Sequence, residues 1–546
     1  MLKSLAIFFV LFYGVIAFTQ IAPDTYWVQF TDKNNSEYSL SSPEDFLSDK
    51  AIERRLKQGI SFDFTDIPVN RFYIDSLKKL GLHIQNVSKW LNGVVIITTD
   101  TNLLDTLHRI SFIADPVYTP AKESKTIAPP KEKFAPAFKD ANDYYFTSTQ
   151  IGMLNGDYLH TSGYRGEGIT IAVLDAGFIN AQSIESLDSL WEENRIIGIK
   201  DFVKDSIDMF LAHSHGTLVL SILAGIVPGN FEGSAPKANY VLVRTENGNR
   251  EYIDEEYNWV CGAEYADSMG VDVINSSLGY SEFQDDSQNH TYADMNGRTT
   301  VVSYGALMAA RKGMLVHCSA GNSGDDPWGY IIAPADADSI IAVGACDSLK
   351  IIANFSSRGN SSDNRVKPDI TAMGSGTSAQ IIPGYFRTCN GTSCSSPVVT
   401  GLSACLWQAN RDFSAQDIRL AIIESADRYN EPDTIYGYGI PDYLLADKTL
   451  KTKAEKNPKL TEIKISPNPV IDIPYFELNL PWLSTTKTGY VEIYNLSGNL
   501  VYYLTKEFNL GKNIFAVQYI SQLEKGFYFS RILIDGRVYH VSFLKQ

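Results

Sequence analysis

Three short segments, far apart along the chain, carry the residue types that a nucleophilic hydrolytic site needs. Asp175 ends an apolar run, His215 precedes Gly-Thr, and Ser393 follows Gly-Thr. A serine hydroxyl is unreactive near neutral pH unless a neighbouring base takes its proton, and histidine is the usual base. A carboxylate beside that histidine fixes its tautomer and stabilises the imidazolium ion. Unrelated folds assemble this triad in different chain orders, and the order here is Asp, His, Ser.

Each of these residues has a competing interpretation. His213 lies two residues before His215 and is an alternative base, while Ser395 and Ser396 are alternative nucleophiles. An aspartate at the end of a strand, such as Asp175, is more often a turn former. The residues alone leave these alternatives open.

The stretch after Ser393 has the pattern of a helix. We expect Pro397 in the first turn of that helix, a position that tolerates proline. The positive end of the helix would then help to stabilise negative charge that develops next to the serine. This setting favours Ser393 as the nucleophile.

Taken together, the segments resemble the subtilisin-like serine proteases. The resemblance rests on the order of the triad residues and on Gly-Thr after the histidine and before the serine. It extends over about 144–450 through three further landmarks, Gly233–Ala238, Phe355–Gly359 and Val366–Ile370. Ala176 departs from the commoner family form, which has Thr or Ser after the aspartate.

The resemblance implies a serine endopeptidase that works through an acyl-enzyme intermediate. It implies that Asn322, in the segment Ser319–Gly324, donates its amide to the oxyanion together with the backbone N–H of Ser393. The implied catalytic residues are therefore Asp175, His215, Ser393 and Asn322. The segment that pairs with extended substrate is implied to be Ser277, Leu278 and Gly279, acting mainly through its backbone.

Between about 144 and 450, apolar β-branched runs alternate with helix-like segments. The runs are 169–174, 240–243, 271–275, 314–319 and 340–344. Continuous apolar strands separated by helices predict a parallel sheet covered on both faces. The predicted fold class is α/β, with a subtilisin-like, doubly wound, mostly parallel sheet. Catalytic groups in such sheets lie at the carboxyl ends of strands, where Asp175 stands.

The residues before this region divide into three parts. Residues 1–19 have a lysine and then an apolar run of signal-peptide length, with cleavage expected before Gln20. Residues 20–118 predict an α+β unit, including a helix from Ser42 to about Gln58. Its segments Ala51–Arg55 and Pro68–Asn70 resemble the inhibitory propeptide of some bacterial secreted subtilases, and the alternative is an independent binding module. Residues 119–143, rich in Pro, Ala and Lys, predict an exposed linker.

The end of the chain changes character again. A second linker is expected at 451–462, and residues 463–546 predict an all-β sandwich of short strands. The segments Ile465–Pro469, Ile493–Gly498 and Leu523–Tyr528, with the closing Lys545-Gln546, resemble the sorting domain of type IX secretion substrates in Bacteroidota. This implies export through the periplasm to the medium or the cell surface, with the type IX machinery as a partner. The alternative is an accessory sandwich that binds polysaccharide or protein.

Composition and charge indicate which kinds of binding partner and cofactor the protein could have. The net charge of −16 argues against nucleic acid. We expect protein or peptide substrates, and no membrane span beyond the signal segment. The chemistry requires no cofactor, whereas acidic runs such as Asp254–Glu256 and Asp285-Asp286 are possible ligands for structural calcium, although a solvated acidic face is the commoner explanation. Six cysteines allow 15 pairings, and none has the spacing of a zinc site.

Two rival functions differ in class or chemistry. A catalytically inactive subtilase fold that serves as a binding or adhesion protein would not need the complete set Asp175, His215, Ser393 and Asn322. An esterase with the same triad is expected to carry Gly-x-Ser-x-Gly, which is absent around Ser393.

Overall fold

The structure, a computed structural model, describes residues 19–114, 139–140, 146–456, 463–480, 483, 485–535 and 537–546. Most of the predicted signal segment and of the linker 119–143 lies outside these residues. The chain divides into two compact units, one comprising 1–409 with 414–444 and the other 410–413 with 445–546. Each unit is described by itself.

A parallel sheet of seven strands forms the centre of the first unit. Its spatial order is β14-β13-β12-β11-β6-β10-β7, and each neighbouring pair is parallel. The strands are β6 Thr170–Asp175, β7 Ile196–Asp201, β10 Asn239–Arg244, β11 Val273–Ser276, β12 Leu315–Ser319, β13 Ile341–Cys346 and β14 Ile370–Met373. The inner strands are buried along their length, as their continuous apolar runs predict. The predicted α/β fold class is confirmed.

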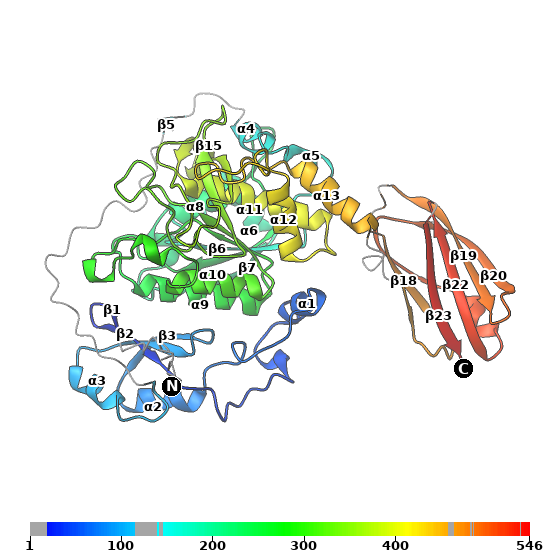
Figure 1. The fold of residues 1–546 in the computed structure, drawn as a ribbon, viewed down its shortest axis with the longest axis horizontal. Coiled ribbons are helices and arrows are strands. Elements are labelled where there is room, and N and C mark those ends of the chain that lie inside the picture. Colours follow the sequence, from blue (N-terminus) through cyan, green and yellow to red (C-terminus); the bar gives the residue numbers. More distant parts are fainter. Residues whose placement is uncertain are drawn as a thin grey trace, which may run out of the picture. The chain divides into compact units, whose positions relative to one another are not determined.

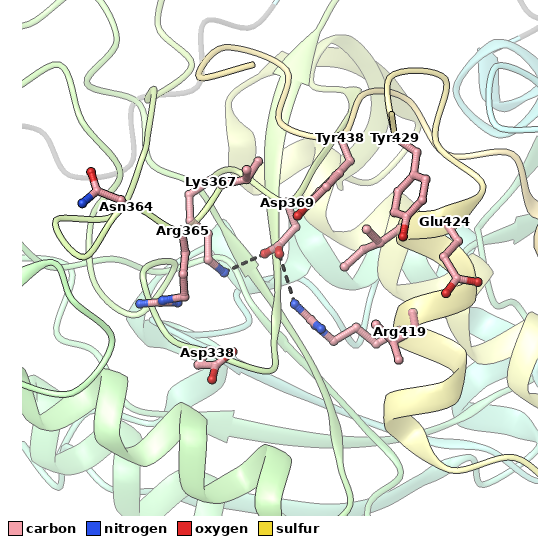
Figure 2. Close-up of a pocket in the computed structure, with 12 residues that line it drawn as sticks. Asp338, Asn364, Arg365, Lys367, Asp369, Arg419, Glu424, Tyr429 and Tyr438 are labelled. Carbon is pink, nitrogen blue, oxygen red and sulfur yellow. Dashed lines mark hydrogen bonds and ion pairs between the residues drawn. The ribbon is translucent and has the colours of Figure 1, made fainter. Parts of the chain in front are cut away.

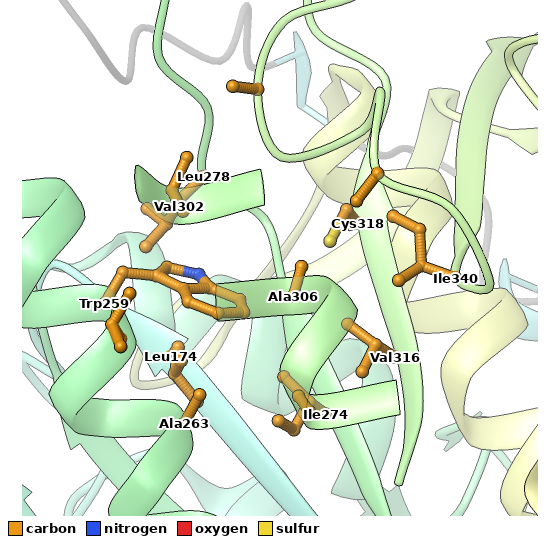
Figure 3. Close-up of a cluster of buried hydrophobic side chains, with 14 of the residues drawn as sticks. Leu174, Trp259, Ala263, Ile274, Leu278, Val302, Ala306, Val316, Cys318 and Ile340 are labelled. Atoms are coloured by element: carbon orange, nitrogen blue, oxygen red, sulfur yellow. The ribbon is translucent and has the colours of Figure 1, made fainter. Parts of the chain in front are cut away.

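Helices cover both faces of this sheet (Figure 1). The principal ones are α8 His215–Ala224, α9 Asp254–Met269, α10 Val301–Arg311, α11 Thr392–Ala409 and α12 Ala415–Glu424. Figure 3 shows the core under α9 and α10, where Trp259 and Ala306 face Ile274 and Val316 of the strands. The helix α8 is buried along its whole length, so the residues at its start are fixed by packing on all sides.

An α+β domain precedes the central sheet in the same unit. Its antiparallel sheet has the order β1-β2-β4-β3, and its own core includes Val28, Leu77 and Val94. Its elements are β1 Thr19–Ala22, β2 Thr25–Gln29, α1 Asp49–Lys57, α2 Arg71–Lys79, β3 His83–Ser88, β4 Gly93–Ile97 and α3 Thr101–Leu107. The helix expected from Ser42 begins instead at Asp49, because the Ser48 hydroxyl accepts the Ala51 N–H and caps it there.

The second unit holds the predicted all-β region, arranged as two sheets with the orders β17-β18-β21 and β20-β19-β22-β23. Its strands are β17 Ile463–Ser466, β18 Tyr475–Leu480, β19 Lys487–Asn495, β20 Leu500–Phe508, β21 Gly511–Ala516, β22 Gly526–Ile534 and β23 Arg537–Lys545. Alternate residues such as Phe476, Val491 and Ile532 point into a shared core. No helix among the described residues is long and apolar enough to span a membrane.

The boundary before this region differs from the prediction. Residues 451–456, expected to begin a linker, continue the helix α13 Tyr443–Lys456. Leu450 and Ala454 are buried, and Lys451 pairs with Asp447 one turn earlier at 2.7 Å. These contacts supply the apolar face and the i,i+4 ion pair that extend the helix.

Candidate active site

The predicted acid and base meet at the carboxyl edge of the central sheet. Asp175 is the last residue of β6, and His215 is the first residue of α8. His215 Nδ1 lies 2.8 Å from Asp175 Oδ1, and both side chains are buried. A carboxylate can only accept a hydrogen bond, so this contact places the proton on Nδ1. The lone pair is then on Nε2, as a general base requires.

Local packing explains why glycine follows this histidine. The backbone N–H of Gly216 donates to Gly177 O at 3.0 Å. A Cβ on Gly216 would lie 2.5 Å from Gly177 O and 3.0 Å from the Cβ of Asp175, so a larger residue would push α8 away from β6. The competing His213 has a different environment, in which its Nδ1 accepts the backbone N–H of His215 at 3.1 Å.

The predicted nucleophile lies in the first turn of the buried helix α11. Ser393 is its second residue and is partly exposed. The residue before the helix, Gly391, has φ +150°, and a Cβ there would lie 2.9 Å from Ser393 Oγ and 3.6 Å from Asn322 Nδ2. The absence of a side chain at Gly391 therefore keeps open the space that the serine hydroxyl and the asparagine amide both border.

Two hydrogen bonds orient the Asn322 amide. Its Oδ1 accepts the backbone N–H of Thr392 at 2.8 Å and the Thr392 hydroxyl at 2.9 Å. The Nδ2 group is thereby left to donate on the side of Ser393. The same hydroxyl accepts the Gly321 N–H at 3.2 Å, which ties the loop after β12 to the start of α11. The structure thus brings Asn322 to the predicted nucleophile.

The sequence predicts Pro397 in the first turn of α11, but in the structure Pro397 is the sixth residue of that helix. Pro397 has no N–H to donate to the carbonyl four residues earlier, which is that of Ser393. Ser277 Oγ donates to this carbonyl instead, at 3.2 Å. Ser277 in turn accepts from Asn275 Nδ2 at 3.1 Å. Sequence reasoning assigned Ser277 to substrate and missed this contact with the backbone of the serine.

The rest of the predicted substrate-binding segment follows β11. Leu278 is buried in the core between α9 and the sheet. A Cβ on Gly279 would lie 2.4 Å from Ile332 Cδ1, so the backbone passes close to the neighbouring loop. Tyr280 then pairs with Ala333 in a short antiparallel bridge. The close packing of Leu278 and Gly279 therefore fixes the backbone of Ser277–Gly279. A contact of this segment with substrate would come from its backbone N–H and C=O groups.

A disulfide that the sequence could not assign brackets the serine. Cys389, in strand β16 Tyr385–Asn390, is bonded to Cys394, the residue after Ser393. Four further cysteines are free and buried: Cys261, Cys318, Cys346 and Cys405. Burial raises the pKa of these four thiols, so they are held as neutral thiols.

The acidic runs considered for calcium have partners within the protein. Glu255 Oε1 accepts the Asn247 N–H at 2.8 Å, and Glu256 accepts the Val302 N–H at 3.0 Å. Glu246, Glu251 and Glu255 bring one carboxylate oxygen each within 4.8 Å of one another. The Tyr280 hydroxyl donates to Glu246, so one of these three carboxylates already accepts a hydrogen bond from within the protein.

A pocket of about 400 Å³ is lined by Asp369 and by residues of α12, among others (Figure 2). Three of its charged residues are paired with one another, because Asp369 binds Lys367 at 2.6 Å and Arg419 at 3.2 Å. Asp369 directly precedes β14, so the pocket lies at the amino edge of the sheet, opposite Asp175. It contains none of the candidate catalytic residues.

The fold is a doubly wound parallel sheet with a paired aspartate and histidine at its carboxyl edge. Residues 166–439, half of the chain, match the model of the subtilase family, and the chain belongs to that family. Residues 25–134 match the peptidase S8 propeptide domain of Bacteroidota, and residues 464–545 match a secretion system C-terminal sorting domain.

Individual proteins match half of this chain or somewhat more. The serine protease AprX of Bacillus subtilis is 28% identical over half of this chain, and the match spans 65% of AprX, just under two thirds. A thermophilic serine proteinase of a Bacillus species is 30% identical over 55% of this chain and 67% of its own length. The crystal structure of MycP1 from Mycobacterium smegmatis covers 61% of this chain and 95% of its own, at 20% identity and a TM-score of 0.46.

Proposed function

We propose that this protein is a secreted serine endopeptidase. The observation that carries the proposal is the 2.8 Å contact between His215 Nδ1 and Asp175 at the start of α8, a helix that packs against α11, in whose first turn Ser393 lies. Membership of the subtilase family and the similarity to bacterial serine proteases support it.

In the proposed reaction, His215 Nε2 takes the proton of Ser393 as its oxygen attacks the scissile carbonyl carbon. The developing oxyanion accepts hydrogen bonds from Asn322 Nδ2 and the Ser393 N–H. The imidazolium then protonates the leaving amine, and an acyl-enzyme remains on Ser393. Water, activated by the same histidine, attacks this ester and restores the serine.

The proposed substrates are proteins or peptides that bind in extended form. Ser277–Gly279 would pair with the substrate backbone as an added strand, with Leu278 anchored in the core. Such backbone pairing gives affinity with little side-chain selectivity. We further propose that turnover needs no metal, since the nucleophile, base and oxyanion donors are all supplied by the chain. Structural calcium stays a prediction, which chelation with EDTA would test through stability and turnover.

The test of the function compares the wild-type protein with Ser393→Ala. The variant loses only the nucleophilic oxygen, so casein hydrolysis should fall at least a thousandfold while circular dichroism stays the same. Activity within tenfold of wild type would refute the assignment. The rival, an inactive fold that serves in binding or adhesion, predicts no hydrolysis by either protein.

Maturation and export complete the proposal. Residues 20–118 would inhibit the enzyme, and the enzyme itself would cut the chain between about 116 and 143. In Ser393→Ala made in isolation, the precursor should therefore persist, and normal processing would mean that another protease cuts it. The match of residues 464–545 to a sorting domain supports export by the type IX machinery to the medium or cell surface.

A further inference from the structure

One sheet of the carboxyl-terminal sandwich is apolar on both of its faces. The strands β20, β19, β22 and β23 lie side by side in this sheet (Figure 1). Burial alternates along β19 and β22, as the pleat of a strand requires. Val491 and Ile532 point into the core of the sandwich. On the other face, the exposed fractions of Tyr490, Phe527 and Phe529 are 40%, 52% and 47%.

The strand register makes these outward side chains neighbours. Tyr490 lies opposite Leu533, which in turn lies opposite Val538, so one apolar row crosses three strands. The rings of Tyr490 and Tyr503 stack at 5.9 Å between centroids, which extends the apolar surface to β20. We call this surface the outer face. Its main apolar residues are Tyr490, Tyr494, Tyr503, Phe527, Phe529 and Leu533.

The other sheet of the sandwich has a different outside. There Glu477 lies opposite both Lys464 and Ile514, and it pairs with Lys512 at 2.9 Å. Charge therefore interrupts the apolar side chains on that sheet. A continuous exposed apolar surface is uncommon on a soluble protein and indicates contact with another surface. The contrast between the two sheets assigns that contact to the outer face.

The outer face is large enough for a weak but specific interface. Four strands about 4.8 Å apart, with outward residues about 6.8 Å apart along each strand, cover roughly 500 Å². Two such faces together bury roughly 1,000 Å², the lower limit for a specific protein interface. Sheets pack face to face at about 10 Å with their strands aligned to within about 30°. A second sheet of the same kind would therefore fit as a further layer.

A pair of opposite charges lies in the middle of the outer face and indicates which partner fits. Glu492 of β19 lies opposite Arg531 of β22, their side chains approach to 3.5 Å, and both remain partly exposed. A two-fold axis along the strands, midway between β19 and β22, places Glu492 of one copy over Arg531 of the partner copy, and the reverse. The same rotation places Tyr490 over Leu533. The outer face is thus complementary to itself in both charge and apolar character.

We propose that two copies of this chain associate through the outer faces of their carboxyl-terminal sandwiches. Each copy offers one acid and one base at matching positions, and a second copy satisfies both at once. The small area makes the dimer weak, with a dissociation constant of about 1–100 µM. This inference goes beyond the proposed function and does not depend on peptidase activity.

The test uses the full chain with Ser393→Ala, so that no self-cleavage occurs. Analytical ultracentrifugation measures the mass between about 1 and 300 µM, a range that brackets the expected constant. The variants Glu492→Arg and Arg531→Glu are measured separately and as an equimolar mixture. Glu477→Arg and Lys512→Glu are the matched controls, because they make the same changes of charge at an ion pair on the other sheet.

We expect a concentration-dependent dimer in the parent and in both controls. Glu492→Arg and Arg531→Glu should each weaken it by roughly thirtyfold or more, since every facing pair at the centre then carries like charges. Their mixture should regain the affinity of the parent, because each charge of one variant faces its opposite on the other. A defect in folding could not be repaired by mixing.

A parent that stays monomeric over the whole range would overturn the proposal and leave the outer face to another partner, such as a polysaccharide or the export machinery. A mixture that associates no better than its components would overturn it as well. Phe529→Thr gives an independent measurement, since threonine suits a strand but removes the ring. It should weaken the dimer by roughly tenfold with an unchanged circular dichroism spectrum. Undiminished association in Phe529→Thr would place the interface elsewhere.

Discussion

The hydroxyl of Thr392 is expected to tune turnover through the Asn322 amide. Replacing threonine by valine keeps the shape of the side chain and the 2.8 Å bond from the Thr392 N–H, but removes the 2.9 Å bond from the hydroxyl. A neutral hydrogen bond contributes about 1 kcal/mol, or roughly fivefold in rate if the whole loss falls on the transition state. The largest decrease in kcat to be expected is the one that follows from losing the Asn322 amide altogether.

Asn322→Ala defines that limit, because it removes the donor itself. It should lower kcat by roughly 10²–10³ with little change in KM, a range known from the corresponding donor in a subtilisin rather than derived from this structure. We therefore expect kcat of Thr392→Val to fall about threefold to thirtyfold, with KM within twofold. Thr392→Ser, which retains the hydroxyl, should stay within threefold of wild type.

Steady-state kinetics on a peptide substrate would measure these values, together with the melting temperature of each variant. Thr392→Val should add nothing to the loss of kcat in Asn322→Ala, since the hydroxyl reaches the oxyanion only through the amide. The loss of its bond from the Gly321 N–H should lower the melting temperature instead. Unchanged kcat in Thr392→Val, or a further drop in the double variant, would refute the argument that the hydroxyl orients the oxyanion donor.

Three other predictions concern the base, the core and the end of the chain. His215→Ala should lose activity as Ser393→Ala does, whereas His213→Ala should retain measurable turnover in the same casein assay; the reverse would transfer the role of base. Burial lowers the pKa of His317 to about 3, so the unfolded chain takes up a proton below about pH 6.5 and the folded chain does not. Stability should fall as pH falls from 6.5 to 3, by about 2 kcal/mol at pH 5. Denaturation of Ser393→Ala with and without His317→Gln would show this, and equal pH slopes would contradict it. A chain that ends at Lys456 should keep its specific activity but accumulate in the periplasm of the native host; wild-type amounts outside the cell would refute the sorting role.

Local patterns were enough to predict the central sheet and the place of Asp175 at its carboxyl edge, whereas the choice of His215 over His213 came from the family resemblance. The apolar run before Asp175 fixes a buried strand, and a parallel sheet places the end of that strand at the catalytic edge. The Gly-Thr pair after His215 lies in the first turn of α8, and the Gly-Thr pair before Ser393 leads into α11.

Contacts between distant residues could not be predicted from the same patterns. The hydroxyl of Ser277 substitutes for the missing N–H of Pro397, and nothing near either residue indicates the other. Arg54 and Arg55 stand out as a motif, but their partner Asp267 is more than 200 residues away and is defined only by the fold. The helix α13 continues past its expected end, because the burial of Ala454 stabilises the helix more than the lysine-rich composition of this stretch destabilises it.

The central claim is that Ser393 is a nucleophile activated at this site. A fluorophosphonate probe reacts covalently with such a serine, and mass spectrometry of the digested protein locates the adduct. We expect one adduct on Ser393 in the mature wild-type protein, strongly reduced in His215→Ala and absent from Ser393→Ala. An adduct on Ser395 or Ser396, or a wild-type protein that hydrolyses peptides without any labelling of Ser393, would contradict the account.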